Sequence, residues 1–185
     1  MPQEMTIWTI QLAVLCQFSV LIGTQFQHQT QLSKGGLNWE WLAKARWMKW
    51  IWLCGGGLAL CHMVCAFHFV HHWSHGLAVQ ATADQTEQLL GIRLGGGVYF
   101  NYLFVITWLL DSAWWSVFPL SYAQRPTWIQ YTIGGYLLFI TLNGTIVFAA
   151  GLSRWGTLLL LLIWIGLAIN NRSLKEKERP LLRTT

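Results

Sequence analysis

Apolar residues along the chain fall into five long stretches separated by short polar segments. A helix needs about 20 mostly apolar residues to cross a bilayer core, and the fifth stretch lies close to the lower limit of that length. Helix is favoured because unpaired backbone groups are costly in hydrocarbon, and the alternation of barrel strands is missing. The pattern predicts an all-α membrane bundle over residues 1–170, with spans at about 6–26, 50–71, 96–118, 128–150 and 155–169.

Composition supports a membrane location. Hydrophobic residues make up 54% of the chain and charged residues only 10%, whereas a soluble domain carries about a quarter charged residues. The chain also has 13 tryptophans, whose indole rings favour the headgroup level of a bilayer. The positive residues sit in short segments rather than on a folded basic face, so the net charge of +5 does not indicate a nucleic-acid partner.

The distribution of positive charge predicts the topology. With five spans, ten lysines and arginines share one side, and only Arg93 and Arg154 lie on the other. The positive-inside rule then places the N-terminus outside and the C-terminus in the cytoplasm. The expected location is a cell membrane or an inner membrane. Residues 171–185 form a basic cytoplasmic tail that we expect to be disordered, and residues 76–94 form an outer segment with a weak helical pattern, which would lie at the interface. The ten residues are Lys34, Lys44, Arg46, Lys49, Arg125, Arg172, Lys175, Lys177, Arg179 and Arg183.

The second apolar stretch carries a stripe of cysteine and histidine. Residues three or four positions apart share a helix face. Seven residues follow this spacing and would form one seam along a continuous helix, with the histidines at its outer end. His71 would lie beside the seam. The seven are Cys54, Leu58, Cys61, Cys65, His68, His72 and His75.

The stripe predicts a metal or haem site, since imidazole and thiolate are preferred ligands of zinc, copper and haem iron. The expected ligands are His68, His72 and His75, with possible help from His71 and Cys65. One helix rarely completes a tetrahedral site. Asp84 and Glu87 in the outer segment, or the histidines of a second copy, could supply further ligands, and Asn101 could orient a histidine.

The same stripe has a simpler interpretation. Cysteine in a membrane helix is commonly a small packing residue, and histidine at an interface bonds water and headgroups. The fragment from His68 to His72 resembles the HxxHH box of membrane desaturases and hydroxylases. Those enzymes use about three boxes, facing the cytoplasm, to hold two irons. The other boxes are absent here and the predicted side is the opposite one, so this family is not assigned.

Other polar points lie inside the apolar stretches. Asp111 is a functional candidate because intramembrane carboxylates are costly, although it could also reach water or pair with Arg125. We expect Asn143 to hydrogen-bond across helices, and the glycine groups 55–57, 95–97 and 134–135 to allow close helix packing. The four cysteines suggest no disulfide framework. No motif supports hydrolase chemistry, and the sequence does not decide whether the protein is an enzyme.

Three functional hypotheses follow. The first is a bundle with a copper, zinc, iron or haem site that serves redox chemistry, metal handling or assembly of a complex. The second is a non-catalytic accessory subunit without a cofactor, forming a homo-oligomer or part of a larger membrane complex. The third is a small transporter. The orientation of His68, His72 and His75 discriminates the first two: a site needs them to converge inside the bundle, whereas a subunit can leave them exposed.

Overall fold

The protein is a bundle of helices. The computed structural model describes the backbone of residues 2–34 and 39–178, and the side chains of residues 4–26 and 46–174. This part contains no strand, which confirms the expected all-α class. Its elements are α1 (Pro2–Lys34), α2 (Trp39–Cys65), the π-helix η1 (Ala66–Val70), α3 (His75–Leu90), α4 (Gly97–Val117), α5 (Pro119–Ala123), α6 (Thr127–Leu142), the π-helix η2 (Asn143–Val147) and α7 (Leu152–Glu178).

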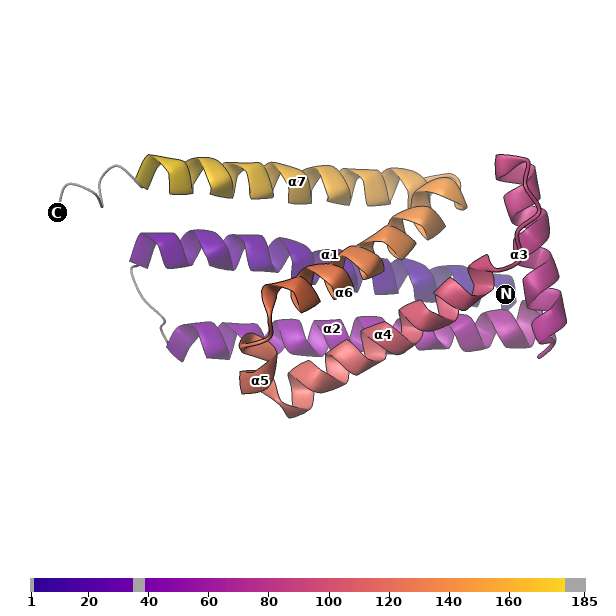
Figure 1. Cartoon of the computed structure of the whole chain (residues 1–185), viewed down its shortest axis with the longest axis horizontal. Coiled ribbons are helices and arrows are strands. Elements are labelled where there is room, and N and C mark those ends of the chain that lie inside the picture. Colours follow the sequence, from indigo (N-terminus) through magenta and orange to yellow (C-terminus); the bar gives the residue numbers. More distant parts are fainter. Residues whose placement is uncertain (1, 35–38, 179–185) are drawn as a thin grey trace.

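The long helices run between two ends of the molecule (Figure 1). Helices α1, α2 and α7 lie alongside one another, while α4 and α6 cross the bundle at an inclination. Helix α3 lies across one end, near the N-terminus, and α5 lies at the other end. We refer to these as the α3 end and the α5 end. Beyond α5, helices α1, α2 and α7 project further than α4 and α6 do.

Among the described residues, three helical segments are long and apolar enough to cross a membrane: Glu4–Phe26 in α1, Arg46–Val70 in α2 and η1, and Leu152–Leu174 in α7. They correspond to the first, second and fifth expected spans. Helix α4 and the α6–η2 pair are helical where the third and fourth spans were expected. Six exposed tryptophans mark the two ends, as expected for rings at membrane–water interfaces: Trp8, Trp73 and Trp155 at the α3 end, and Trp47, Trp50 and Trp128 at the α5 end.

Some boundaries differ from the sequence expectations. The break before α7 lies at residues 148–151, where Gly151 adopts a positive φ of 63°. Helix α7 then continues to Glu178, so the expected disorder of the tail is wrong for residues 171–178. Its polar last turns remain helical because they extend an already formed apolar helix, and propagation is easier than nucleation. Residues 179–185 lie outside the described part.

The centre of the bundle is the crossing of α2 and α4. Gly55 and Gly56 let the Trp108 ring approach the α2 backbone, and a methyl group added at Gly55 would lie 2.6 Å from Trp108 Cζ2. Trp108 is 1% exposed and its ring centroid lies 5.1 Å from that of Trp52. Two of the expected glycine contacts are thus confirmed here. Gly57, Gly134 and Gly135 have no atom within 4 Å of an added methyl group.

Helix α1 is held by a ladder of polar side chains. Gln11 donates to Ser153 Oγ at 2.7 Å, Gln17 Oε1 accepts from the Thr141 hydroxyl at 2.6 Å, and Asn171 donates to Gln25 at 3.0 Å. The three rungs follow α1 from the α3 end to the α5 end. Such bonds between helices are favoured in a bilayer, where lipid offers no alternative partner.

Candidate functional site

The histidine-rich segment does not form one continuous helix. Helix α2 changes to a π-helix at Ala66, where His71 N–H bonds the Ala66 carbonyl five residues back at 3.0 Å. A π-turn holds more residues than an α-turn and therefore rotates the following side chains off the earlier face. The expected seam from Cys54 to His75 is consequently broken after Cys65.

The chain then reverses direction. His72 and Trp73 both adopt a positive φ, of 47° and 60°, a conformation that is uncommon for residues with side chains. Ser74 caps the next helix by accepting from Leu77 N–H at 3.3 Å, and His75 is the first residue of α3. His68 and His75 thus belong to different helices, and His72 lies in the turn between them.

The three expected ligands are exposed and do not converge. His68 Nδ1 accepts from the Trp73 indole N–H at 3.2 Å. His75 is held by α4 instead, with Tyr102 Oη 3.0 Å from Nδ1 and Tyr99 Oη 3.2 Å from Nε2. Both ring nitrogens of His75 are therefore occupied by tyrosine hydroxyls.

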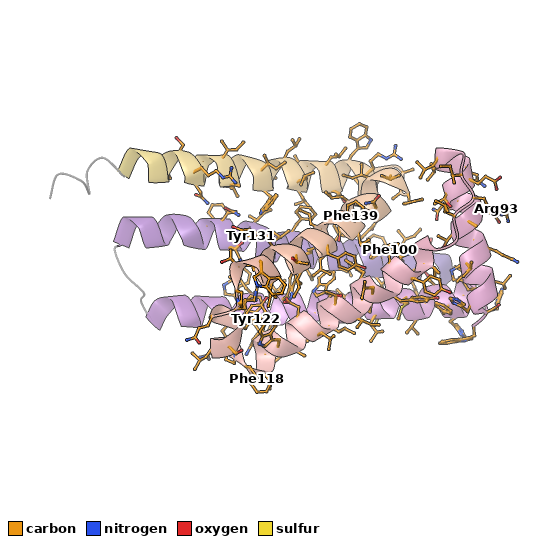
Figure 2. The ribbon with its side chains drawn as sticks, viewed as in Figure 1. Arg93, Phe100, Phe118, Tyr122, Tyr131 and Phe139 are labelled. Carbon is orange, nitrogen blue, oxygen red and sulfur yellow. The ribbon has the colours of Figure 1, made fainter. Side chains whose placement is uncertain are left out.

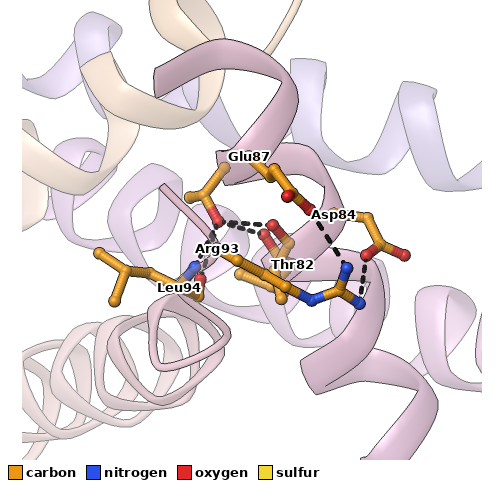
Figure 3. Close-up of polar contacts among 7 residues, drawn as sticks. Thr82, Asp84, Glu87, Arg93 and Leu94 are labelled. Atoms are coloured by element: carbon orange, nitrogen blue, oxygen red, sulfur yellow. Dashed lines mark hydrogen bonds and ion pairs between the residues drawn. The ribbon is translucent and has the colours of Figure 1, made fainter. Parts of the chain in front are cut away.

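The expected acidic ligands bind an arginine (Figure 3). Arg93 Nη2 lies 2.7 Å from Asp84 Oδ1, and Arg93 Nη1 lies 3.1 Å from Glu87 Oε2. The same loop is fixed to α3 by Thr86, whose hydroxyl donates to the Leu94 carbonyl at 2.8 Å. Both carboxylates neutralise a cation on their own segment and do not reach the histidines.

Across the described residues, no three histidine, cysteine, aspartate or glutamate side chains come together in a way that could hold a metal ion. Asn101, the expected orienting residue, is exposed on α4, and Cys65 is a free, partly buried thiol. His71 is partly buried in the turn, and burial followed by the charge of His72 lowers its pKa below the usual 6.5. His71 therefore favours the neutral form.

A second polar cluster lies towards the α5 end, and sequence analysis identified only part of it. Asp111 on α4 is 4% exposed, and its Oδ2 accepts from the Trp52 indole N–H at 2.8 Å and from the Tyr122 hydroxyl at 2.9 Å. A second bond between α4 and α2 runs from the Trp108 indole N–H to the Trp52 carbonyl at 3.1 Å. Together, these hydrogen bonds join α2, α4 and α5.

Arg125 completes this cluster. Its guanidinium carbon lies 3.5 Å from the centroid of the Tyr122 ring. The Trp115 ring is stacked on Tyr122 at a centroid distance of 5.0 Å and an interplanar angle of 5°. Figure 2 shows Tyr122 near α5, far from Arg93 at the α3 end. Burial raises the pKa of Tyr122, so its hydroxyl stays protonated and donates to Asp111. We call Trp52, Asp111, Tyr122 and Arg125 the polar clasp.

The sequence contained partial signals for the clasp. Asp111 stood out as a carboxylate in an apolar stretch, and Arg125 was considered as its partner, but Trp52 and Tyr122 looked like ordinary aromatic residues. Asn143 was expected to bond across helices. This expectation is wrong, since its side chain donates to Phe139 O in the preceding turn at 2.8 Å, and a nearer acceptor was available within its own helix.

The chain shows no significant similarity to a protein family, to a curated protein or to a solved structure. Its function must therefore be argued from its own geometry.

Proposed function

We propose that this chain is a five-span integral membrane protein that acts as a non-catalytic accessory subunit of a membrane assembly. The main support is that His68, His72 and His75 are exposed and lie on different elements. In addition, Asp84 and Glu87 form ion pairs with Arg93. Buried Gln17, Asp111 and Thr141 form hydrogen bonds between helices, which is a structural use. The geometry favours a subunit over a metal or haem protein.

The surface supports this proposal. Large apolar side chains are exposed along the long helices, such as Leu110 and Leu162 at 66% each and Phe139 at 61%. Lipid tails or the helices of another membrane protein would cover them. A second copy of the chain or a larger complex is the partner that such a surface suits.

Charge placement supports five spans with the C-terminus in the cytoplasm. Of the ten cationic residues expected there, Arg179 and Arg183 lie beyond the described part, and the other eight fall at the α5 end. Arg93 and Arg154 lie at the α3 end. Arg93 is neutralised by two carboxylates, and Arg154 donates to the Ala149 carbonyl at 2.7 Å. The lysines and arginines are thus concentrated at one end, as the positive-inside rule requires.

Labelling of single cysteines tests the span count. In a variant with the four native cysteines replaced by serine or alanine, Gln85→Cys and Gln124→Cys each place a thiol at an exposed position. Five spans predict that an impermeant maleimide labels Gln85→Cys in intact cells and reaches Gln124→Cys only after permeabilisation. If α4 and α6 do not cross, both positions would react from outside, and the five-span topology would be wrong.

Metal content and assembly size test the role. Protein purified in mild detergent should show no haem absorption and sub-stoichiometric copper, zinc and iron, unchanged by His68→Ala/His72→Ala or by the control His28→Ala. Native electrophoresis of solubilised membranes should place the chain in an assembly larger than its own 21.2 kDa plus detergent. A stoichiometric metal or haem lost only in the His68/His72 variant would contradict the proposal, as would a monomer in every mild detergent.

A further inference from the structure

The polar clasp contains buried polar atoms that no protein group satisfies. Asp111 Oδ1 is buried and has no hydrogen-bond partner, and the same holds for Arg125 Nε and Nη1. Asp111 as a whole is 4% exposed, so bulk water does not reach the carboxylate directly. A buried polar group without a partner is destabilising, and more so when it is charged.

The unsatisfied atoms lie on complementary groups on either side of Tyr122. Tyr122 places its hydroxyl 2.9 Å from Asp111 Oδ2 and its ring face 3.5 Å from the Arg125 guanidinium carbon. The two charged groups are therefore neighbours, and the charge of Arg125 acts on Asp111. They form no direct ion pair within 4.0 Å in the described side chains. The unpartnered acceptor and the unpartnered donors thus belong to two residues that both contact Tyr122.

We propose that the polar clasp is an internal water-binding site, in which water bridges Asp111 Oδ1 to Nε and Nη1 of Arg125. The ligand must donate to a carboxylate and accept from a guanidinium at the same time, and water is the smallest molecule that does both. A stably held internal water makes two to four hydrogen bonds, and the three atoms offer enough partners.

The bridging water gives the second carboxylate oxygen of Asp111 a donor, in addition to the Tyr122 and Trp52 donors on Oδ2. The water site is independent of whether the chain is an accessory subunit.

Radiolytic labelling in ¹⁸O-water tests the proposal on the full chain in lipid nanodiscs. Hydroxyl radicals formed from a bound water label the adjacent side chain and resist a scavenger dissolved in the bulk. We expect scavenger-resistant labelling of Tyr122 to exceed that of Tyr136 several-fold. Tyr136 is a matched control because it is also partly exposed, but its hydroxyl donates to the Phe100 carbonyl at 2.7 Å. Exposed Tyr99 should lose its label when the scavenger is added.

A variant adds a second readout. Arg125→Met keeps an unbranched side chain over the Tyr122 ring but removes the donors, so it should lower the scavenger-resistant label on Tyr122 to the level of Tyr136. Labelling of Tyr122 that is no stronger than that of Tyr136, or that disappears with the scavenger, would overturn the proposal, and this comparison needs only the unmodified chain.

Discussion

The two ends of the bundle use polar side chains in opposite ways. At the α3 end, His68, His72 and His75 stand exposed on a turn between two helices. Towards the α5 end, Asp111 lies buried and accepts two hydrogen bonds from aromatic side chains of other elements. The histidine segment is the denser cluster in the sequence, yet the carboxylate has the stronger structural role.

The difference shows that the structural role of a polar residue depends more on its orientation and partners than on how many polar residues lie near it in the sequence. A histidine at the membrane surface can be satisfied by water, so nothing forces the three rings to converge. A carboxylate within a helix bundle is out of reach of bulk water and must find its donors inside the bundle. Four predictions test this contrast, and they are ordered from the largest expected effect to the smallest.

Replacement of Asp111 should have the largest effect. Asp111→Leu leaves the Trp52 indole N–H, the Tyr122 hydroxyl and the Arg125 charge without their partner, and we expect a loss of about 3–5 kcal/mol of unfolding free energy. Asp111→Asn keeps an acceptor oxygen and should lose distinctly less. Denaturant titration in detergent micelles, followed by tryptophan fluorescence, measures both. Equal stability of Asp111→Leu and the parent protein would show that the polar clasp does not stabilise the fold.

The glycine triplet on α2 provides an internal comparison of packing. Gly55→Ala would bring a methyl group within 2.6 Å of Trp108 Cζ2 and 3.0 Å of Cys16 Cβ, and such overpacking costs about 1–3 kcal/mol. Gly57→Ala meets no atom within 4 Å and should be neutral or slightly stabilising, because alanine is the better helix former. Similar thermal stability of the two variants would show that α2 and α4 do not cross closely at Gly55.

The buried hydrogen bond between Gln17 and Thr141 should have an intermediate effect on the unfolding free energy. Gln17→Leu removes the acceptor of the Thr141 hydroxyl, and a double-mutant cycle with Thr141→Val should give a coupling of about 0.6–1.7 kcal/mol. Ser19→Ala is the control on the same helix, since its hydroxyl bonds only the Leu15 carbonyl of α1. A coupling of zero between Gln17 and Thr141 would contradict their contact.

The histidines should matter least for stability. His68→Ala, His72→Ala and His75→Ala lie at exposed sites and should each change the unfolding free energy by less than about 0.5 kcal/mol. His71 should make the stability of the fold weakly dependent on pH. Since its pKa is lowered in the folded state from 6.5, the unfolded state binds the proton more tightly, and stability falls as the pH drops through 6.5. His71→Gln should flatten stability curves recorded between pH 8 and pH 5.

The sequence predicted the helical class and the positions of the helices well, because five apolar stretches are a strong signal. It could not predict the end of the histidine seam. Helical spacing continues through His72 and His75 in the sequence, and the positive φ values of His72 and Trp73 depend on how α3 packs against α4. The partners of Asp111 were equally hidden, since Trp52 lies 59 positions away along the chain and only the crossing of α2 and α4 brings the two together.

The α1 ladder has a consequence for how the protein is made. Helix α1 is synthesised first, but Gln11, Gln17 and Gln25 bond residues of α6 and α7, which are synthesised last. Until then, α1 must enter the membrane with amide side chains that lack their final partners. The first helix is thus expected to stay near the insertion machinery, or to hold waters and lipid headgroups, until the last helix arrives. Truncation before Leu152 would then leave Gln11 and Gln25 without their partners and should mark the shortened chain for degradation.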